Sequence, residues 1–221
     1  MKERYKIIFL LLFTILFING CGGSSTTSQE SVIRYGVGIF TDDGIEYKVS
    51  AWFFTNGSNK SADIVVCGKK IPTDQTKVSL GTLKPGDPVP VHVSYPDLGG
   101  IGTTLKTPGT PVYTLTVAEL NQWFKQSPPT SLTINWTDTI SLPYKGGVYI
   151  TDKDGTCIAQ EPWFTLNPQM IIDSTKSANL INTPGATGVL VRVYGYDVFT
   201  DKTHSSEIYI AGPSVDLKTT F

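Results

Sequence analysis

The chain has 221 residues, of which 17% are charged and 40% hydrophobic. Its 18 Lys and Arg residues nearly balance 19 Asp and Glu residues, for a formal net charge of −1. This balance argues against a nucleic-acid partner, which would require a basic surface, and it provides no electrostatic attraction to anionic lipid.

The first 20 residues have the pattern of an export signal. Lys2, Arg4 and Lys6 precede the apolar run 7–18, in which Thr14 is the one polar member. A helix that crosses a membrane needs about 20 apolar residues, so this run is short for a membrane anchor. A basic start followed by a short apolar run is typical of a secretory signal peptide.

The signal ends in Ile18-Asn19-Gly20-Cys21, and a small residue directly before a cysteine resembles the cleavage site of bacterial lipoproteins. The resemblance implies cleavage after residue 20 and attachment of lipid to Cys21, which would fasten the protein to a membrane of the bacterial cell envelope. Gly22 and Gly23 replace the acidic residue that often retains lipoproteins in the inner membrane, so the resemblance favours the outer membrane. The alternatives are a plain secretory signal with an incidental cysteine, and a true membrane anchor.

Residues 21–31 are predicted to form the lipidated cysteine and a flexible linker, because 22–31 contain no apolar side chain. Lys2, Glu3, Arg4 and Lys6 leave with the signal, so the mature chain keeps 15 basic and 18 acidic side chains. Its formal charge of −3 again argues against nucleic acid.

From Val32 onward, short runs of alternating apolar and polar residues predict β-strands that bury one face. Turn residues punctuate these runs about every 8–14 residues, as in sandwiches and barrels. Asp42-Asp43-Gly44 is predicted to be a hairpin turn, and Asp152-Lys153-Asp154-Gly155 is interpreted as a second hairpin turn in preference to a calcium loop. The clearest alternation lies in 45–51, 89–95, 132–137 and 189–196.

One segment predicts a helix. Thr116 and Glu119 form a capping box, and Val117, Leu120 and Phe124 then fall on one face of a helix over 117–125. The helix must end before Ser127-Pro128-Pro129. The proline pair is the predicted boundary between a first domain, 32–128, and a second, 129–221. We expect the helix to pack against one or both domains and to hold them together.

The second domain resembles a fibronectin type III domain. The likeness lies in the segment 128–137, with its proline entry and core Trp136, and in 189–197 and 206–210, which resemble the last two strands of that family. It implies an all-β fold of two tandem immunoglobulin-like or fibronectin type III-like antiparallel sandwiches, with one short helix near their junction. The alternative is one larger β-sandwich that runs through both halves.

Cys67 and Cys157 are the two cysteines that lipid attachment does not use. In an oxidising compartment they could form a disulfide between the two halves, or they could be buried separately as small apolar side chains. Two cysteines alone do not indicate a metal site, so no metal or cofactor is expected.

Trp123 and Trp163 lie near proline-rich connections and are the candidates for a surface platform that binds sugars. Packing between the domains is the alternative for both. Trp136 is assigned to the core, and Trp52 lies in the apolar run 51–54.

No spacing of residues points to catalysis. His204, Ser205 and Glu207 include triad-like residue types, but neighbours along a strand point to opposite faces, so 203–207 is interpreted as a solvated hairpin. His92 also lacks a second ligand for zinc at a suitable spacing. An enzyme would require carboxylates that converge, and the candidates are Asp97, Asp138, Asp173 and Asp197.

The sequence therefore predicts a non-enzymatic envelope lipoprotein that acts as a binding or scaffolding module for protein partners. The alternative function is a carbohydrate-binding module, or an accessory subunit of a glycan-processing system or of a secretion or pilus assembly.

Overall fold

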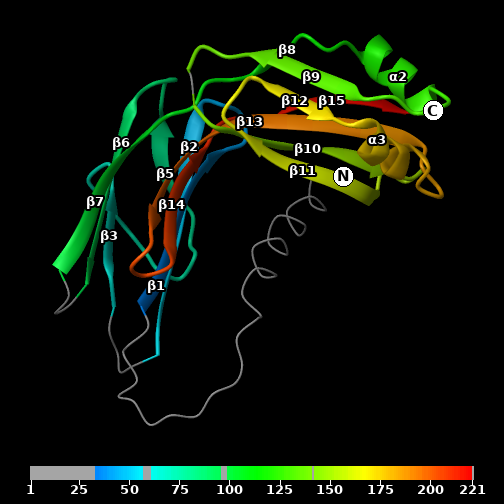
Figure 1. The fold of residues 1–221 in the computed structure, drawn as a ribbon. Helices are drawn as coiled ribbons and strands as arrows, with labels where there is room; N and C mark the ends of the chain where they lie inside the picture. Colours follow the sequence, from blue (N-terminus) through cyan, green and yellow to red (C-terminus); the bar gives the residue numbers. More distant parts are fainter. Residues whose placement is uncertain (1–32, 57–60, 96–98, 141, 221) are drawn as a thin grey trace. The chain divides into compact units, whose positions relative to one another are not determined.

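The computed structural model describes residues 33–56, 61–95, 99–140 and 142–220 (Figure 1). The predictions for the signal, for Cys21 and for the linker to residue 31 lie outside these residues, as does Asp97. The described residues are mostly β-strand, and neither of the two helices among them is long and apolar enough to cross a membrane.

Seven strands come first along the chain: β1 (Ile33–Thr41), β2 (Glu46–Thr55), β3 (Asp63–Val66), β4 (Lys69–Ile71), β5 (Val78–Thr82), β6 (Pro88–Tyr95) and β7 (Gly99–Lys106). The elements that follow are β8 (Val112–Tyr113), α2 (Val117–Lys125), β9 (Leu132–Thr137), β10 (Tyr144–Thr151), β11 (Cys157–Thr165), β12 (Gln169–Ile172), α3 (Ser174–Ile181), β13 (Gly188–Asp201), β14 (Ser206–Ala211) and β15 (Val215–Thr220).

The strands form one eight-stranded sheet and two smaller ones. The large sheet has the order β11-β10-β13-β14-β1-β2-β5, and β15 also pairs with β13. The first part of β13 pairs with β10 and β15, and its last six residues pair with β14. Among the described strands, β1 and β14 pair in parallel and the other pairings are antiparallel. The smaller sheets have the orders β4-β3-β6-β7 and β12-β9-β8.

Two hydrophobic cores lie on the same face of the large sheet. On β13, Val191 and Val193 are buried in the second core, and Phe199, an even number of residues further on, packs against the first. Residues separated by an even number share a face of a strand, so one face of β13 serves both cores. The sheet β4-β3-β6-β7 supplies Ile64 and Val91 to the first core, and β12-β9-β8 supplies Trp136 to the second.

The residues of the two cores are not divided at residue 128, where the boundary between the two domains was predicted. Leu120 and Trp123 already belong to the second core, together with residues up to Val193, and Ile208 and Ile210 return to the first core. The continuous large sheet is closer to the alternative of one larger sandwich than to two separate modules in tandem.

The predicted alternation is correct in most strands, as shown by the buried inner positions of β6, β9 and β13. Two residues depart from it. Ile45 is 60% exposed at the end of the β1–β2 turn instead of facing inward with Tyr47. Tyr196, on the opposite side of β13 from Val193, is only 3% exposed. Both predicted Asp-Gly turns are confirmed. Asp43 accepts hydrogen bonds from the backbone N–H groups of Ile45 and Glu46, and Asp152 closes the β10–β11 turn in the same way.

The predicted helix is confirmed as α2, with the capping box between Thr116 and Glu119. Its buried side chains are Leu120 and Trp123, and its closest strand is β15. The helix thus packs into the second core, and the expectation that it holds the two halves together is not met by these contacts. β13 links the cores instead.

Candidate functional site

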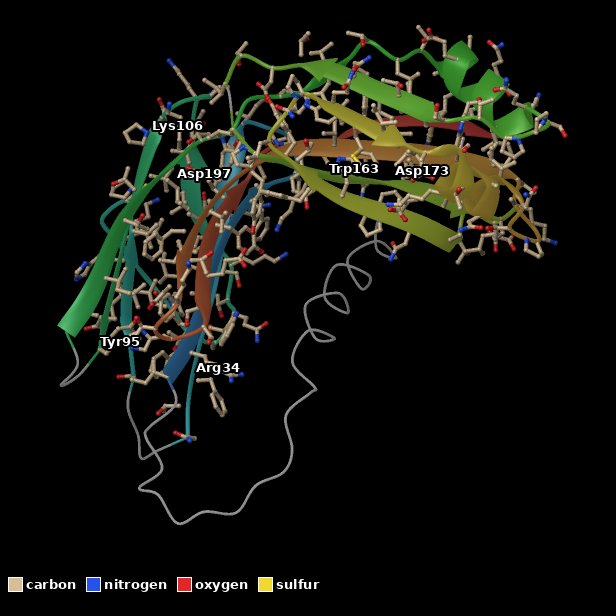
Figure 2. The ribbon with its side chains drawn as sticks, in the orientation of Figure 1. Arg34, Tyr95, Lys106, Trp163, Asp173 and Asp197 are labelled. Atoms are coloured by element: carbon tan, nitrogen blue, oxygen red, sulfur yellow. The ribbon has the colours of Figure 1, made fainter. Side chains whose placement is uncertain are left out.

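The predicted platform of Trp123 and Trp163 is wrong, because both side chains are buried, with 4% and 7% of their surface exposed. Trp123 packs in the second core, where its indole N–H lies 3.0 Å from the carbonyl oxygen of Thr130 and 3.2 Å from the hydroxyl of Ser177. Trp163 lies against Gly146, on the face of β11 that is turned to the same core (Figure 2). Neither ring is available to a sugar.

Cys67 and Cys157 are both free thiols, so the disulfide considered from the sequence is not formed. Cys67 lies in the two-residue turn between β3 and β4, where it and Gly68 have φ angles of 49° and 77°. It packs against the first core, whereas Cys157 begins β11 in the other half. Burial raises the pKa of both thiols, which disfavours the reactive thiolate.

The candidate carboxylates each bind a different segment of backbone. Asp173 caps α3 by accepting from the N–H of Lys176, and Asp197 accepts from the N–H of Lys106 at 2.6 Å (Figure 2). Asp138 accepts from the N–H of Ile140 in the β9–β10 connection. Among the described residues, no group of three or more His, Cys, Asp or Glu side chains could hold a metal ion.

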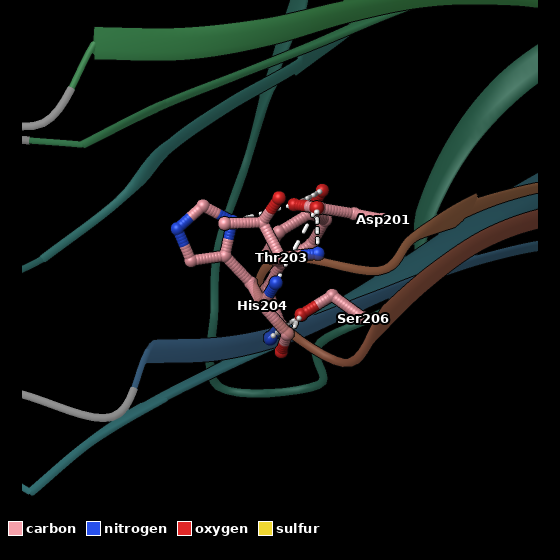
Figure 3. Close-up of polar contacts among 5 residues, drawn as sticks. Asp201, Thr203, His204 and Ser206 are labelled. Carbon is pink, nitrogen blue, oxygen red and sulfur yellow. Dashed lines mark hydrogen bonds and ion pairs between the residues drawn. The ribbon is translucent and has the colours of Figure 1, made fainter.

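Asp201 and His204 form a polar cluster at the hairpin between β13 and β14, in which the Asp201 carboxylate is buried (Figure 3). One carboxylate oxygen of Asp201 lies 2.6 Å from Nδ1 of His204 and accepts from the Tyr35 hydroxyl at 3.0 Å. Its other oxygen accepts from the backbone N–H groups of Thr203 and His204. Burial alone would raise the pKa of Asp201, but the bonds from His204 and Tyr35 outweigh burial and lower it.

The cluster stabilises the hairpin and does not form a catalytic triad. The Ser206 hydroxyl donates to the carbonyl oxygen of His204 at 2.9 Å and accepts from the N–H of Tyr35, so it is not directed at the imidazole. The predicted hairpin is present, and Thr203, Ser205 and Glu207 are exposed, but the prediction that it is solvated is wrong for Ser206, which is 2% exposed. His92 lies apart from this cluster, exposed on β6.

The face of the large sheet that is turned away from both cores carries a different set of aromatic residues; we call it the open face. Three of its glycines are covered by rings. A Cβ atom added to Gly36 would lie 2.2 Å from the Trp52 indole, one on Gly38 would lie 2.7 Å from the Tyr209 hydroxyl, and one on Gly147 would lie 2.8 Å from the Tyr149 ring. Each ring therefore lies across the space where a side chain would otherwise stand.

Further aromatic residues on the open face connect these rings. Tyr196, which is itself only 3% exposed, stacks on Tyr209, with ring centroids 5.5 Å apart and planes 28° from parallel. Tyr194 lies two residues before Tyr196 on the same face of β13, opposite Lys145 of β10. Burial raises the pKa of Tyr209 to about 12 and that of Tyr194 further, so these phenols are neutral hydrogen-bonding groups near pH 7.

Charged groups between the rings are paired within the face. Arg192 donates two hydrogen bonds of 2.7 Å to Asp216, and Asp216 raises the Arg192 pKa. The Lys145 ammonium lies 3.5 Å from the centroid of the Tyr196 ring, and burial lowers its pKa although Glu207 acts in the opposite direction. The Tyr196 hydroxyl in turn donates to the Glu207 carboxylate.

The sequence pattern did not reveal this face, because Tyr194 and Tyr196 fall on the polar side of the alternation in 189–196. A usable signal was present. The polar positions of β13 and β14 carry aromatic residues, and Gly36 and Gly38 supply the flat positions on β1. The sequence does not indicate that β14 pairs with β1, which is the pairing that places Tyr209 beside Gly38.

The sequence matches no known family model, and no curated protein matches it.

Proposed function

We propose that this chain is a non-enzymatic lipoprotein of the bacterial cell envelope that binds a partner on the open face of its large sheet. In this proposal Cys21 carries lipid in the outer membrane, residues 22–31 are a flexible linker, and the domain that follows needs neither metal nor cofactor. The two halves are immunoglobulin-like or fibronectin type III-like sandwiches that share β13.

The observation that carries the proposal is the open face itself. A β-sheet that only supports a fold needs one apolar face, and here both cores occupy that face. The opposite face nevertheless carries Trp52, Tyr194 and Tyr209, and the exposed Phe54 and Phe164 lie on the same side of β2 and β11. Clusters of exposed aromatic residues mark interaction sites more often than chance.

The position of the domain is also consistent with an envelope role. The chain enters β1 directly after the predicted linker, and a coil of about ten residues spans on the order of 15–20 Å. The folded part would thus remain close to the membrane and present its sheet to neighbouring envelope components.

Lipid attachment is tested by labelling cells that express the full chain with an alkyne-bearing palmitate. We expect label on the wild type in the membrane fraction, and loss of the label together with loss of cleavage in Cys21→Ala. Cys67→Ala is the matched control, because it removes a cysteine from the folded domain and should keep the label. Labelling that persists in Cys21→Ala, or wild type found without lipid in the soluble fraction, would contradict lipid attachment.

A further inference from the structure

We infer that the open face binds a neutral, linear oligosaccharide, with its sugar rings stacked on Trp52, Tyr209, Tyr194 and Tyr149. This inference rests on the proposed function and specifies the partner of the same face.

The orientation of the rings is the first argument. Because Trp52 lies across Gly36 and Tyr209 across Gly38, both rings lie along the sheet surface, and both side chains are partly exposed. Gly36 and Gly38 are two residues apart on β1, which places the two covered positions roughly 7 Å apart. A pyranose with equatorial substituents has two faces formed by C–H groups, and such faces pack on flat aromatic rings.

The length of the array is the second argument. Tyr209 contacts Tyr196 by stacking, and Tyr194 lies on the same face of β13. On β10 the Tyr149 ring covers Gly147, which pairs with Arg192, two residues before Tyr194. The row therefore crosses from the strands that support the first core to the strands that support the second. An extended chain of sugars could contact several of these rings at once, whereas a single compact ligand could not.

The chemistry at the edges of the rings is the third argument. Tyr194 and Tyr209 offer neutral hydroxyls that both donate and accept, and Glu207 and the Arg192–Asp216 pair are held in place by their own bonds. Sugar hydroxyls need both donors and acceptors. The pairing of Arg192 and Lys145 within the face leaves these cations less able to attract an anion, which favours a neutral ligand.

The test uses the full chain, purified in a detergent that has no sugar head group. Cellohexaose and chitohexaose, neutral hexamers of glucose and of N-acetylglucosamine, are titrated by calorimetry and by tryptophan fluorescence. Trp123, Trp136 and Trp163 are buried in the second core, so a ligand-dependent change in fluorescence reports mainly on Trp52. We expect saturable binding of at least one hexamer and a change in emission on the same concentration scale.

Glycine substitutions make the test specific without removing any ring. Gly38→Ala and Gly36→Ala should push Tyr209 and Trp52 out of their positions and weaken binding by about tenfold or more, because one stacking contact is lost. Gly102→Ala on β7 is the matched control, since its Cβ would lie 3.7 Å from His92 on a different sheet, and it should bind as the wild type does. Thermal unfolding of each variant confirms that it is folded.

Two results would overturn the inference: no saturable binding by the folded wild type, or equal weakening in Gly102→Ala. If neither hexamer binds but a protein is cross-linked to the open face in cells, the oligosaccharide is the wrong partner and the proposed function stands. If lipid labelling and cross-linking both fail, the proposed function itself fails.

Discussion

At the scale of single residues, the most consequential polar group is the buried carboxylate of Asp201. It accepts hydrogen bonds from His204, from the Tyr35 hydroxyl and from two backbone N–H groups, and thereby ties the β13–β14 hairpin to β1. A buried acceptor of this kind leaves several donors without partners when it is removed. The hairpin should therefore depend on the charge of this one residue.

We predict that Asp201→Asn lowers the free energy of unfolding at pH 7 by about 1–3 kcal/mol. Because the folded-state pKa of Asp201 is lowered, the stability it contributes is present above its unfolded pKa of about 3.9 and is lost as the pH falls through the lower folded value. The difference between wild type and variant should therefore shrink below about pH 4. Urea denaturation across pH is the measurement.

Asp42→Asn is the control for this prediction. Asp42 is exposed and lies 3.6 Å from Lys48, so its loss should change stability by less than about 1 kcal/mol. A difference for Asp201→Asn that stayed constant from pH 7 to pH 3 would contradict the role given to its charge.

At the scale of elements, α2 is a support of the second core. Leu120 is fully buried, Trp123 lies three residues further along the same helical face, and Val117 is 47% exposed. The sequence predicted a stripe of Val117, Leu120 and Phe124 that would join two domains. The helix has the predicted ends, and Leu120 and Phe124 do pack in the second core, but Val117 is exposed and Trp123 is buried.

Leu120→Ala should destabilise the protein by about 2–5 kcal/mol, because it leaves a cavity in the second core. Val117→Ala, on the exposed side of the same helix, should cost no more than about 0.5 kcal/mol. Chemical denaturation of both variants is the comparison. Equal effects would show that α2 does not support the core.

Local pattern therefore predicted much of the fold. Alternation identified the inner residues of β6, β9 and β13, and the capping box located α2, because both signals depend on neighbours in sequence. On β11, however, Trp163 and Phe164 are adjacent, and a shift of one residue exchanges which of them is buried. Only the pairing of β11 with β10 determines that Trp163 faces inward.

Pairing between distant strands also explains why the candidate site was missed. Gly38 and Tyr209 lie opposite one another on β1 and β14, although most of the chain separates them in sequence. Their contact depends on a parallel pairing that no local pattern specifies. The sequence accordingly pointed to Trp123 and Trp163, which occupy the core, and not to Trp52 and Tyr209.

At the scale of the whole described domain, β13 contributes to both cores and therefore couples their stability. The chain builds most of the first core, then the second, and returns to the first through Ile208 and Ile210. The second core contains residues of β13, and the first core contains residues of β14, which the chain reaches only through β13. Cooperative unfolding is expected for such an arrangement.

Ile64→Ala should therefore destabilise the second core as well as the first. Ile64 is fully buried in the first core, and its truncation should cost about 2–5 kcal/mol. In a Trp52→Phe background the remaining tryptophans all lie in the second core, so their fluorescence reports unfolding there. We expect the midpoint of that transition to fall. An unchanged midpoint would mean that the cores unfold independently.

The central claim is that the open face meets a partner in the cell envelope, and photo-cross-linking in living cells tests it most directly. A photoreactive residue at Thr200, exposed on β13 and paired with Glu207, is compared with one at Thr104, exposed on β7 in the smaller sheet. The account predicts a discrete adduct, either glycan or protein, from position 200 and none from position 104. Adducts from position 104 alone, or equal adducts from both positions, would contradict it.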